Sequence, residues 1–241
     1  MQVYISSKEI EEIAQSLVQI SCGNTPPKQI DIDAVAEYLG LPVVYERIAE
    51  DDQDKIGFVS DGRYPLNVYR NGQKRKVAFP KDTIVLEKFL LQPEETTRRR
   101  FVLAHEISHV LIGRADPIRT AACFNRVFDA EQTYGISELH KRMSLEECQA
   151  NAMAALLLMP YELLTSAVHR HLHREKIPIY GNSVFLPTMK PTLKKMSEEL
   201  GVSYTAMLIQ LKKYDLLEQR EMQEYFQATM QNGGECDADR I

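Results

Sequence analysis

The chain has 241 residues, of which 44% are hydrophobic and 26% are charged, and its formal net charge is −5 at pH 7. This length and apolar content are sufficient for a hydrophobic core, which excludes a disordered chain. The negative net charge argues against a protein that coats nucleic acid with its whole surface, although it is compatible with a local basic patch.

The start of the chain lacks targeting signals. Residues 1–9 have neither the basic-then-apolar order of a signal peptide nor a long apolar run. The longest such run, residues 152–159, is far too short to cross a bilayer. The four cysteines show no CxxC spacing, which indicates reduced thiols rather than a disulfide framework. We therefore expect a cytoplasmic protein with no membrane partner.

The first part of the chain predicts two helices followed by strands. Helical spacing covers residues 8–20, and residues 31–40 form a shorter segment with an acidic start and a glycine stop. Turn signals at Asp61-Gly62 and Asn71-Gly72 separate four short runs that have strand character. These runs are residues 41–47, 55–59, 65–70 and 83–86. They predict a small antiparallel sheet.

A helix over residues 93–113 carries the most informative motif, HExxH. Pro93 suits a first helical turn and Gly113 suits a C-terminal stop. Residues i and i+4 of a helix project from one face, so His105 and His109 can bind one cation. Glu106, rotated by roughly 100°, can reach a water on that cation. This spacing fits hydrolysis by a metal-activated water.

The histidines share a stripe with apolar residues, so we expect both imidazoles to be buried, and buried polar groups need partners. Two interpretations follow from the pattern. Either a metal ion binds His105 and His109, or both are core histidines that backbone carbonyls satisfy. The intervening Glu106 favours the metal.

A tetrahedral catalytic zinc needs a third protein ligand, and residues 144–160 supply the best candidate. After Asn151 this segment is apolar on every side, which predicts a helix buried in the core. Glu147 lies one turn before Asn151 on the same face, and a carboxylate that enters a core must be paired, hydrogen-bonded or metal-bound. The competing interpretation is a capping box in which Glu147 folds back onto Ser144. Glu146 is the alternative ligand.

Two blocks of the chain resemble the ImmA/IrrE-type zinc metallopeptidases. The first block is residues 99–109, RRFVLAHEISH, and the second is residues 147–160, which begins with Glu147 and ends in LLMP. In that family the two histidines and the glutamate that opens the second block bind zinc, and the glutamate inside HExxH is the general base. The resemblance implies that His105, His109 and Glu147 bind Zn²⁺, with Asn151 supporting a ligand from behind, and that Glu106 is catalytic.

The same resemblance implies limited cleavage of a helix-turn-helix repressor, which would derepress stress-response or mobile-element genes. It also implies that the sheet edge beside the zinc holds the substrate as an added strand. One departure is the segment from residue 114 to 143, which is usually shorter in the family. Tyr134 or His140 in this insertion could donate a hydrogen bond to the transition state, if the insertion folds over the site.

The last third of the chain predicts further helices. Helix continues over residues 161–174, where His169, His171 and His173 lie among arginines and indicate a solvated helix end rather than a second metal site. Residues 177–187 look like a connection. Residues 192–200 and 204–211 then form a helix-turn-helix-like unit. Its second helix offers few groups that read DNA, so a structural or protein-docking role is favoured over DNA binding.

Together these features predict an α+β fold with a mostly helical metallopeptidase core. We expect a zinc metallopeptidase domain over residues 1–174, a helix-turn-helix-like subdomain over 175–230 and a disordered tail over 231–241. The metal is expected to be zinc, while manganese or iron could occupy the same ligands. The alternative function is a non-catalytic DNA- or protein-binding regulator, or a toxin-antitoxin component, that keeps a structural metal site.

Overall fold

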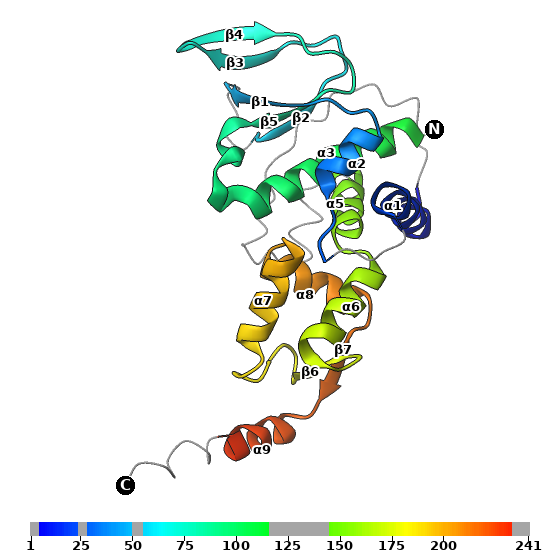
Figure 1. The fold of residues 1–241 in the computed structure, drawn as a ribbon, viewed down its shortest axis with the longest axis vertical. Coiled ribbons are helices and arrows are strands. Elements are labelled where there is room, and N and C mark those ends of the chain that lie inside the picture. The colour runs from blue at the N-terminus through cyan, green and yellow to red at the C-terminus, as the bar shows by residue number, and fades with distance from the viewer. Residues whose placement is uncertain (1–4, 24–27, 50–54, 116–144, 233–241) are drawn as a thin grey trace.

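The structure of the protein is a computed structural model, and it describes residues 5–23, 28–49, 55–115 and 145–232. The helices are α1 (Ser7–Cys22), α2 (Ile32–Tyr38), α3 (Thr96–Ala115), α5 (Leu145–Leu158), α6 (Tyr161–Leu172), α7 (Lys190–Leu200), α8 (Tyr204–Lys213) and α9 (Met222–Asn232). The strands are β1 (Val43–Ile48), β2 (Gly57–Val59), β3 (Leu66–Arg70), β4 (Gln73–Val77), β5 (Ile84–Glu87), β6 (Ile177–Tyr180) and β7 (Leu217–Arg220). Two short 3-10 helices, η1 (Lys88–Leu91) and η2 (Pro93–Glu95), precede α3. The predicted α+β fold is confirmed, and Figure 1 shows the larger sheet at one end of the molecule and α9 at the other.

The larger sheet has the strand order β2-β5-β1-β3-β4. It is mixed rather than purely antiparallel as we predicted, because β1 pairs in parallel with β5 while the other neighbours pair antiparallel. The antiparallel prediction assumed that consecutive strands pair by hairpins. In the sequence, β2 and the β3-β4 hairpin lie between β1 and β5, and the chain then returns to place β5 beside β1 in the same direction.

Three strands were missing from the sequence prediction. The polar stretch of β4 lacks an alternating pattern, and it becomes a strand because the Asn71-Gly72 turn folds it onto β3. Both turn residues have positive φ, as a tight two-residue hairpin requires. β6, which we expected to be a connection, pairs in parallel with β7. Their pairing partners lie about forty residues apart in the sequence, which no local pattern reveals.

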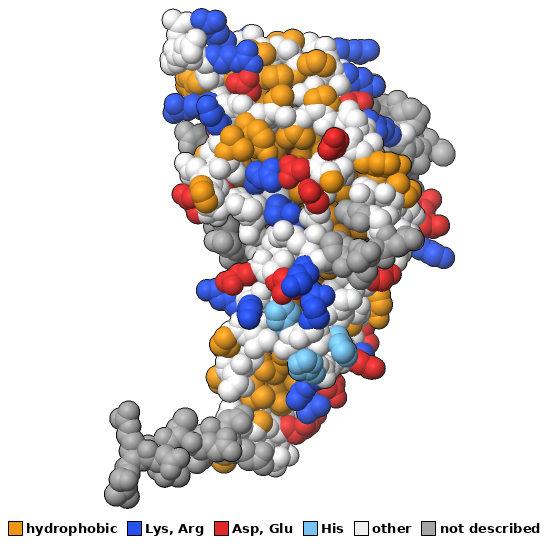
Figure 2. Space-filling view, in the orientation of Figure 1, with side chains coloured by type: hydrophobic (Ala, Val, Ile, Leu, Met, Phe, Trp, Pro, Cys, Tyr) orange, Lys and Arg blue, Asp and Glu red, His pale blue; other side chains and the backbone are white. Residues whose placement is uncertain are grey.

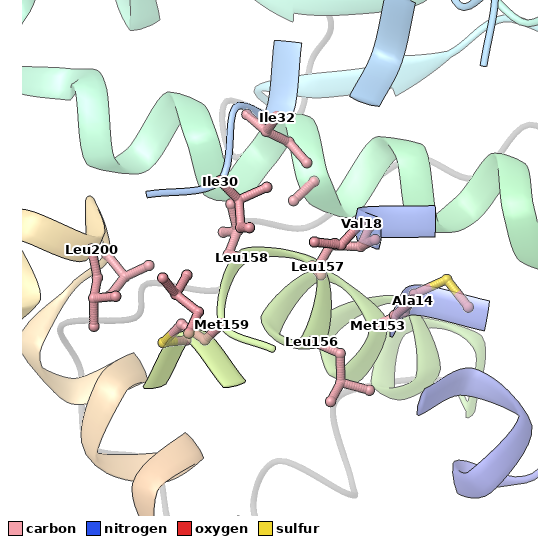
Figure 3. Close-up of a cluster of buried hydrophobic side chains, with 14 of the residues drawn as sticks. Ala14, Val18, Ile30, Ile32, Met153, Leu156, Leu157, Leu158, Met159 and Leu200 are labelled. Atoms are coloured by element: carbon pink, nitrogen blue, oxygen red, sulfur yellow. The ribbon is translucent and has the colours of Figure 1, made fainter. Parts of the chain in front are cut away.

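The predicted helices around the motif are present. α3 follows η2, whose first residue is Pro93, and it continues through Gly113 to Ala115, so the predicted stop at Gly113 was wrong; a helix tolerates an isolated glycine. α5 is buried along most of its length, as its apolar sequence predicted. Figure 3 shows this core around α5, with contributions from α1, α7 and the segment that leads into α2. The labelled side chains are Ala14, Val18, Ile30, Ile32, Met153, Leu156, Leu157, Leu158, Met159 and Leu200.

α7 and α8 form the predicted helix-turn-helix-like unit, with Gly201 in the left-handed conformation at the turn. A buried arginine of α3 connects this unit to the rest of the core. Arg100 is 6% exposed, and it donates hydrogen bonds to the backbone carbonyl oxygens of Gly201 (3.1 Å) and Ile30 (2.8 Å). One hydrophobic cluster includes residues of α1, α3, α5, α7 and α8, so the unit shares its core with the motif helices. The division into domains at residues 174 and 175 stays a prediction.

The first residues of the predicted disordered tail belong to a helix. α9 continues through Asn232, so the first two residues of the tail that we predicted to be disordered are helical. A helix gains one hydrogen bond for each residue by which it is extended, and the composition of the tail gave no sign that the helix would extend into it.

Among the described residues, no single helix has the length and hydropathy for a membrane crossing, and only α5 and α6 together, across a 51° bend, pass that test.

Candidate metal centre

The two histidines of the motif lie side by side on α3, as the i, i+4 spacing predicted. Their side chains are each 7% exposed. The Nε2 atoms of His105 and His109 are 2.9 Å apart, and the rings meet edge to face with their centroids 4.6 Å apart. Both imidazoles therefore point one ring nitrogen at the same small volume.

α5 brings a carboxylate to this volume. Glu147 Oε2 lies 3.3 Å from His105 Nε2, and Glu147 Oε1 lies 3.5 Å from His109 Nε2. α3 and α5 pack directly against each other. Ala104 on α3 and Ala150 on α5 are fully buried, and such small side chains allow close approach. The carboxylate thus faces the imidazoles, as we expect of a ligand. Ser144, its partner in the capping-box interpretation, lies outside the described residues.

The donor atoms of these three residues all lie within 4.8 Å of one another. A tetrahedral site with bonds of about 2.0–2.2 Å separates neighbouring donor atoms by roughly 3.3–3.6 Å. The two separations between Glu147 and the imidazoles, 3.3 and 3.5 Å, lie within this range, and the separation of 2.9 Å between the two Nε2 atoms is shorter. Two imidazoles and one carboxylate are also a ligand set that zinc accepts in catalytic sites. The residues therefore fit a metal ion in both geometry and chemistry.

Glu106 follows His105 on α3 and is fully buried. Its carboxylate lies against β2, the edge strand of the larger sheet, at Gly57. A Cβ atom placed on Gly57 would be 2.2 Å from Glu106 Oε1 and 2.9 Å from its Cδ. Gly57 lies in a predicted strand, and no role was predicted for it. A glycine inside a strand pattern is a known sign that another group approaches the backbone closely, and that sign was available.

A comparison with protein families agrees with this geometry. The model of the IrrE N-terminal-like domain, peptidase family M78, matches residues 36–212. This range covers well over half of the chain and includes both helices that carry the donor atoms. The chain belongs to this family. It is accordingly a metallopeptidase of the ImmA/IrrE type, as the resemblance predicted. A search of curated proteins gave no significant match.

In this IrrE-type peptidase, Asn151 lies behind His105. Its Oδ1 is 2.9 Å from His105 Nδ1. A carbonyl oxygen can only accept, so Asn151 holds the proton on Nδ1 and directs Nε2 of His105 toward the centre. A bound cation would take the Nε2 lone pair, in place of the hydrogen bond that Nε2 otherwise makes to Glu147. This is the supporting position that the sequence analysis gave to Asn151.

Electrostatics keeps Glu147 ionised. Burial raises the pKa of Glu147, but hydrogen bonds and charge attraction from His105 and His109 outweigh it and lower the pKa to about 2. A carboxylate must be ionised to bind a metal. At neutral pH this side chain therefore has the charge that a ligand needs.

Other residues from the sequence analysis lie elsewhere. Tyr134 and His140 are outside the described residues, and so is the side chain of the alternative ligand, Glu146. At the end of α6, His171 Nε2 lies 2.9 Å from Glu199 Oε2 of α7, while His169 and His173 are exposed. Figure 2 shows histidine side chains on this surface among lysines and arginines. No group of metal-binding residues was found here among the described residues, so the solvated helix end describes this segment better than a second metal site.

Proposed function

We propose that the protein is a zinc-dependent endopeptidase in which His105, His109 and Glu147 bind the metal and Glu106 is the general base. The observation that carries the proposal is the convergence of three donor atoms from two helices, within 4.8 Å of one another and largely buried. Manganese or iron could occupy the same ligands, since none of the three donors excludes them.

The residues divide the chemistry between them. When bound, zinc supplies Lewis acidity and lowers the pKa of the attacking water from 15.7 toward about 7. Glu106 accepts the proton of that water and then passes a proton to the amine nitrogen that leaves. The buried position of Glu106 excludes bulk water from this transfer. Asn151 keeps His105 in the orientation that the centre requires.

The edge of β2 is suited to bind the substrate backbone. Glu87 N donates to Ile56 O and Ser60 N donates to Thr83 O, so the even-numbered residues of this segment turn their backbone groups toward β5. In an antiparallel ladder the intervening residues face the other way. Gly57 and Val59 therefore direct their N–H and C=O groups to an edge on which no further strand lies within the described ranges. An extended substrate segment could add there as a strand, next to Glu106.

The proposed substrate is a helix-turn-helix transcriptional repressor. Cleavage would derepress stress-response or mobile-element genes. The support for this substrate is the family resemblance, together with a strand edge that recognises backbone rather than side chains. Recognition by backbone alone gives little sequence specificity, so a specific target must be selected by additional contacts.

The test is a cleavage assay with the repressor encoded beside the gene of this protein. The purified protein is loaded with zinc or manganese, its metal content is measured, and new N-termini in the repressor are mapped by mass spectrometry. We expect a specific fragment that disappears with a chelator and with Glu106→Gln, which leaves the three ligands intact. Glu95→Gln, a change of a surface glutamate just before α3, should cleave normally.

The opposite pattern would support the alternative function. If Glu106→Gln and the unchanged protein behave alike, both in the assay and in derepression of a reporter gene, the metal site is structural and the protein regulates by binding. If the repressor is bound but never cut with either metal, the interpretation as a toxin-antitoxin component gains weight.

A further inference from the structure

Gly57 and Glu106 make the closest approach between the sheet and the motif helix. A Cβ atom on Gly57 would meet Glu106 Oε1 at 2.2 Å, Glu106 Cδ at 2.9 Å and Val102 Cγ1 at 2.9 Å. Real Cβ atoms essentially never show contacts under 3.0 Å. The space that a side chain of residue 57 would need is therefore occupied by the carboxylate.

The backbone of Gly57 does not itself require a glycine. Among the described residues, the glycines with a positive φ are Gly23, Gly40, Gly62, Gly72, Gly181 and Gly201, and Gly57 is not one of them. It lies in a regular strand, where any L residue can adopt the backbone conformation and where glycine is a weak strand former. The reason for a glycine at this position is consequently its neighbour, Glu106.

β2 is held more firmly than the carboxylate. It pairs with β5 along one edge, and its neighbouring side chains are buried, with Phe58 2% exposed and Ile56 6% exposed. A shift of β2 away from α3 would disturb both the pairing and the packing. The side chain of Glu106 can instead rotate about its own bonds. A methyl group at residue 57 would thus displace the carboxylate before it displaced the strand.

We propose that Gly57 is a positioning residue for Glu106, because its missing side chain forms the slot that holds the carboxylate beside the attacking water. This inference rests on the proposed function, in which Glu106 is the general base. The substrate edge is formed by the N–H and C=O of Gly57, which lie in the plane of the sheet. A side chain would project out of that plane, so substitution should disturb the base and not the backbone contacts to substrate.

The first experiment compares two glycine variants. Gly57→Ala should lower kcat on the order of 10²-fold, since a misplacement of about 1 Å in a reacting group has effects of that size. KM, zinc content and Tm should change little. The matched control is Gly113→Ala on α3, the helix that carries Glu106, where a Cβ would meet nothing within 4 Å. This control should keep full activity. Equal kcat values for both variants would overturn the proposal.

The second experiment is a rescue that a purely structural role would not give. The single variant Glu106→Asp shortens the side chain by one methylene. By itself it should lower kcat, because the carboxylate no longer reaches the water. Combined with Gly57→Ala, it retracts the carboxylate from the new methyl group. The double variant should therefore lose much less than the product of the two single losses. If the loss of kcat in the double variant equals the product of the two single losses, the proposal is contradicted.

A crystal structure of Gly57→Ala supplies a readout that needs no substrate. Glu106 Oε1 should have moved until it is at least 3.0 Å from the new Cβ, with β2 in place. A moved β2 with an unmoved carboxylate would overturn the inference. If Gly57→Ala folds poorly, the additional change Val102→Ala removes the second clash and leaves only the one with Glu106.

These outcomes separate the two proposals. If Glu106→Gln retains cleavage, the proposed function fails, whereas the crystallographic result on Gly57 still stands or falls by itself. If Glu106→Gln abolishes cleavage while Gly57→Ala equals Gly113→Ala, only the inference about Gly57 fails.

Discussion

The α3-α5 pair and the α7-α8 pair are both packed helices in one hydrophobic core, but they bury different side chains. α3 contains four of the buried polar residues found in the described part of the chain, which are Arg100, His105, Glu106 and Ser108. α7 and α8 bury only Ser197 and Gln210 among theirs. Ser197 of α7 and Ser108 of α3 each donate to a carbonyl oxygen of their own helix, whereas the imidazoles of α3 face a carboxylate from another helix.

This difference indicates which of the two helix pairs contains the functional site. A buried hydroxyl that its own helix satisfies adds little constraint. Polar groups that converge from separate helices are costly to bury unless another group, such as a metal ion, binds them. Such a cluster therefore indicates a functional site. The α3-α5 pair is therefore the candidate active region, and the α7-α8 pair supports it by packing. The predictions below test this contrast.

The largest effect is expected at the ligands. Glu147→Ala removes the only carboxylate of the three donors, so bound zinc should fall to background and cleavage should be lost. Asn151→Ala removes only the hydrogen bond to His105 and should weaken metal affinity about 10–100-fold. Metal content by mass spectrometry and a competition titration with a chelator measure both. A Glu147→Ala protein that still binds one zinc per chain would contradict the assignment of Glu147 as a ligand, and with it the contrast between the two helix pairs.

The second effect concerns the connection between the two pairs. Arg100→Met keeps an unbranched apolar side chain but removes the guanidinium, so the carbonyl oxygens of Gly201 and Ile30 lose their donor. The free energy of unfolding should fall by about 1–3 kcal/mol, as is typical when a buried polar group loses its partner. Urea denaturation measures it, with exposed Arg98→Met as the control.

Metal content sharpens this second prediction. Arg100 contacts neither histidine nor Glu147 in the hydrogen bonds and ion pairs described, so Arg100→Met should bind zinc normally once folded. Loss of zinc in a folded Arg100→Met protein would show that the α7-α8 pair controls the metal centre, and that the two regions are not separable.

The sequence predicted the grouping of the candidate ligands better than the topology of the sheets. The spacing of HExxH placed His105 and His109 correctly because helical geometry is local. The contact of Glu147 with both imidazoles was expected from a buried carboxylate, yet its distance depends on how α3 and α5 pack. β4, β6 and β7 were missed because their pairing depends on residues distant in the sequence or on a turn. The contact between Gly57 and Glu106 likewise joins a strand and a helix that no local pattern relates.

The smallest effect is expected on the surface of the helical unit. Hydrogen bonds and charge attraction from Arg170, assisted by His171, lower the pKa of Glu199 below its ordinary value of 4.5. A lowered folded pKa means that the stabilisation is complete above the unfolded value and disappears as the pH falls through the folded one. Since the pair is partly exposed to solvent, its contribution is at most about 1 kcal/mol.

Urea denaturation at pH 7 and near pH 3 checks this prediction. The unchanged protein should lose slightly more stability between these two pH values than Glu199→Gln does. Glu198→Gln, a change of the exposed neighbour, should follow the unchanged protein. A Glu199→Gln protein with an identical pH dependence would indicate that this ion pair contributes nothing measurable.

The most direct measurement is anomalous X-ray diffraction at the zinc edge from crystals grown with one equivalent of zinc. We predict one strong peak within about 2.0–2.2 Å of His105 Nε2, His109 Nε2 and a Glu147 carboxylate oxygen. A peak at another place, or none in crystals that contain Glu147 in the position described, would contradict the account.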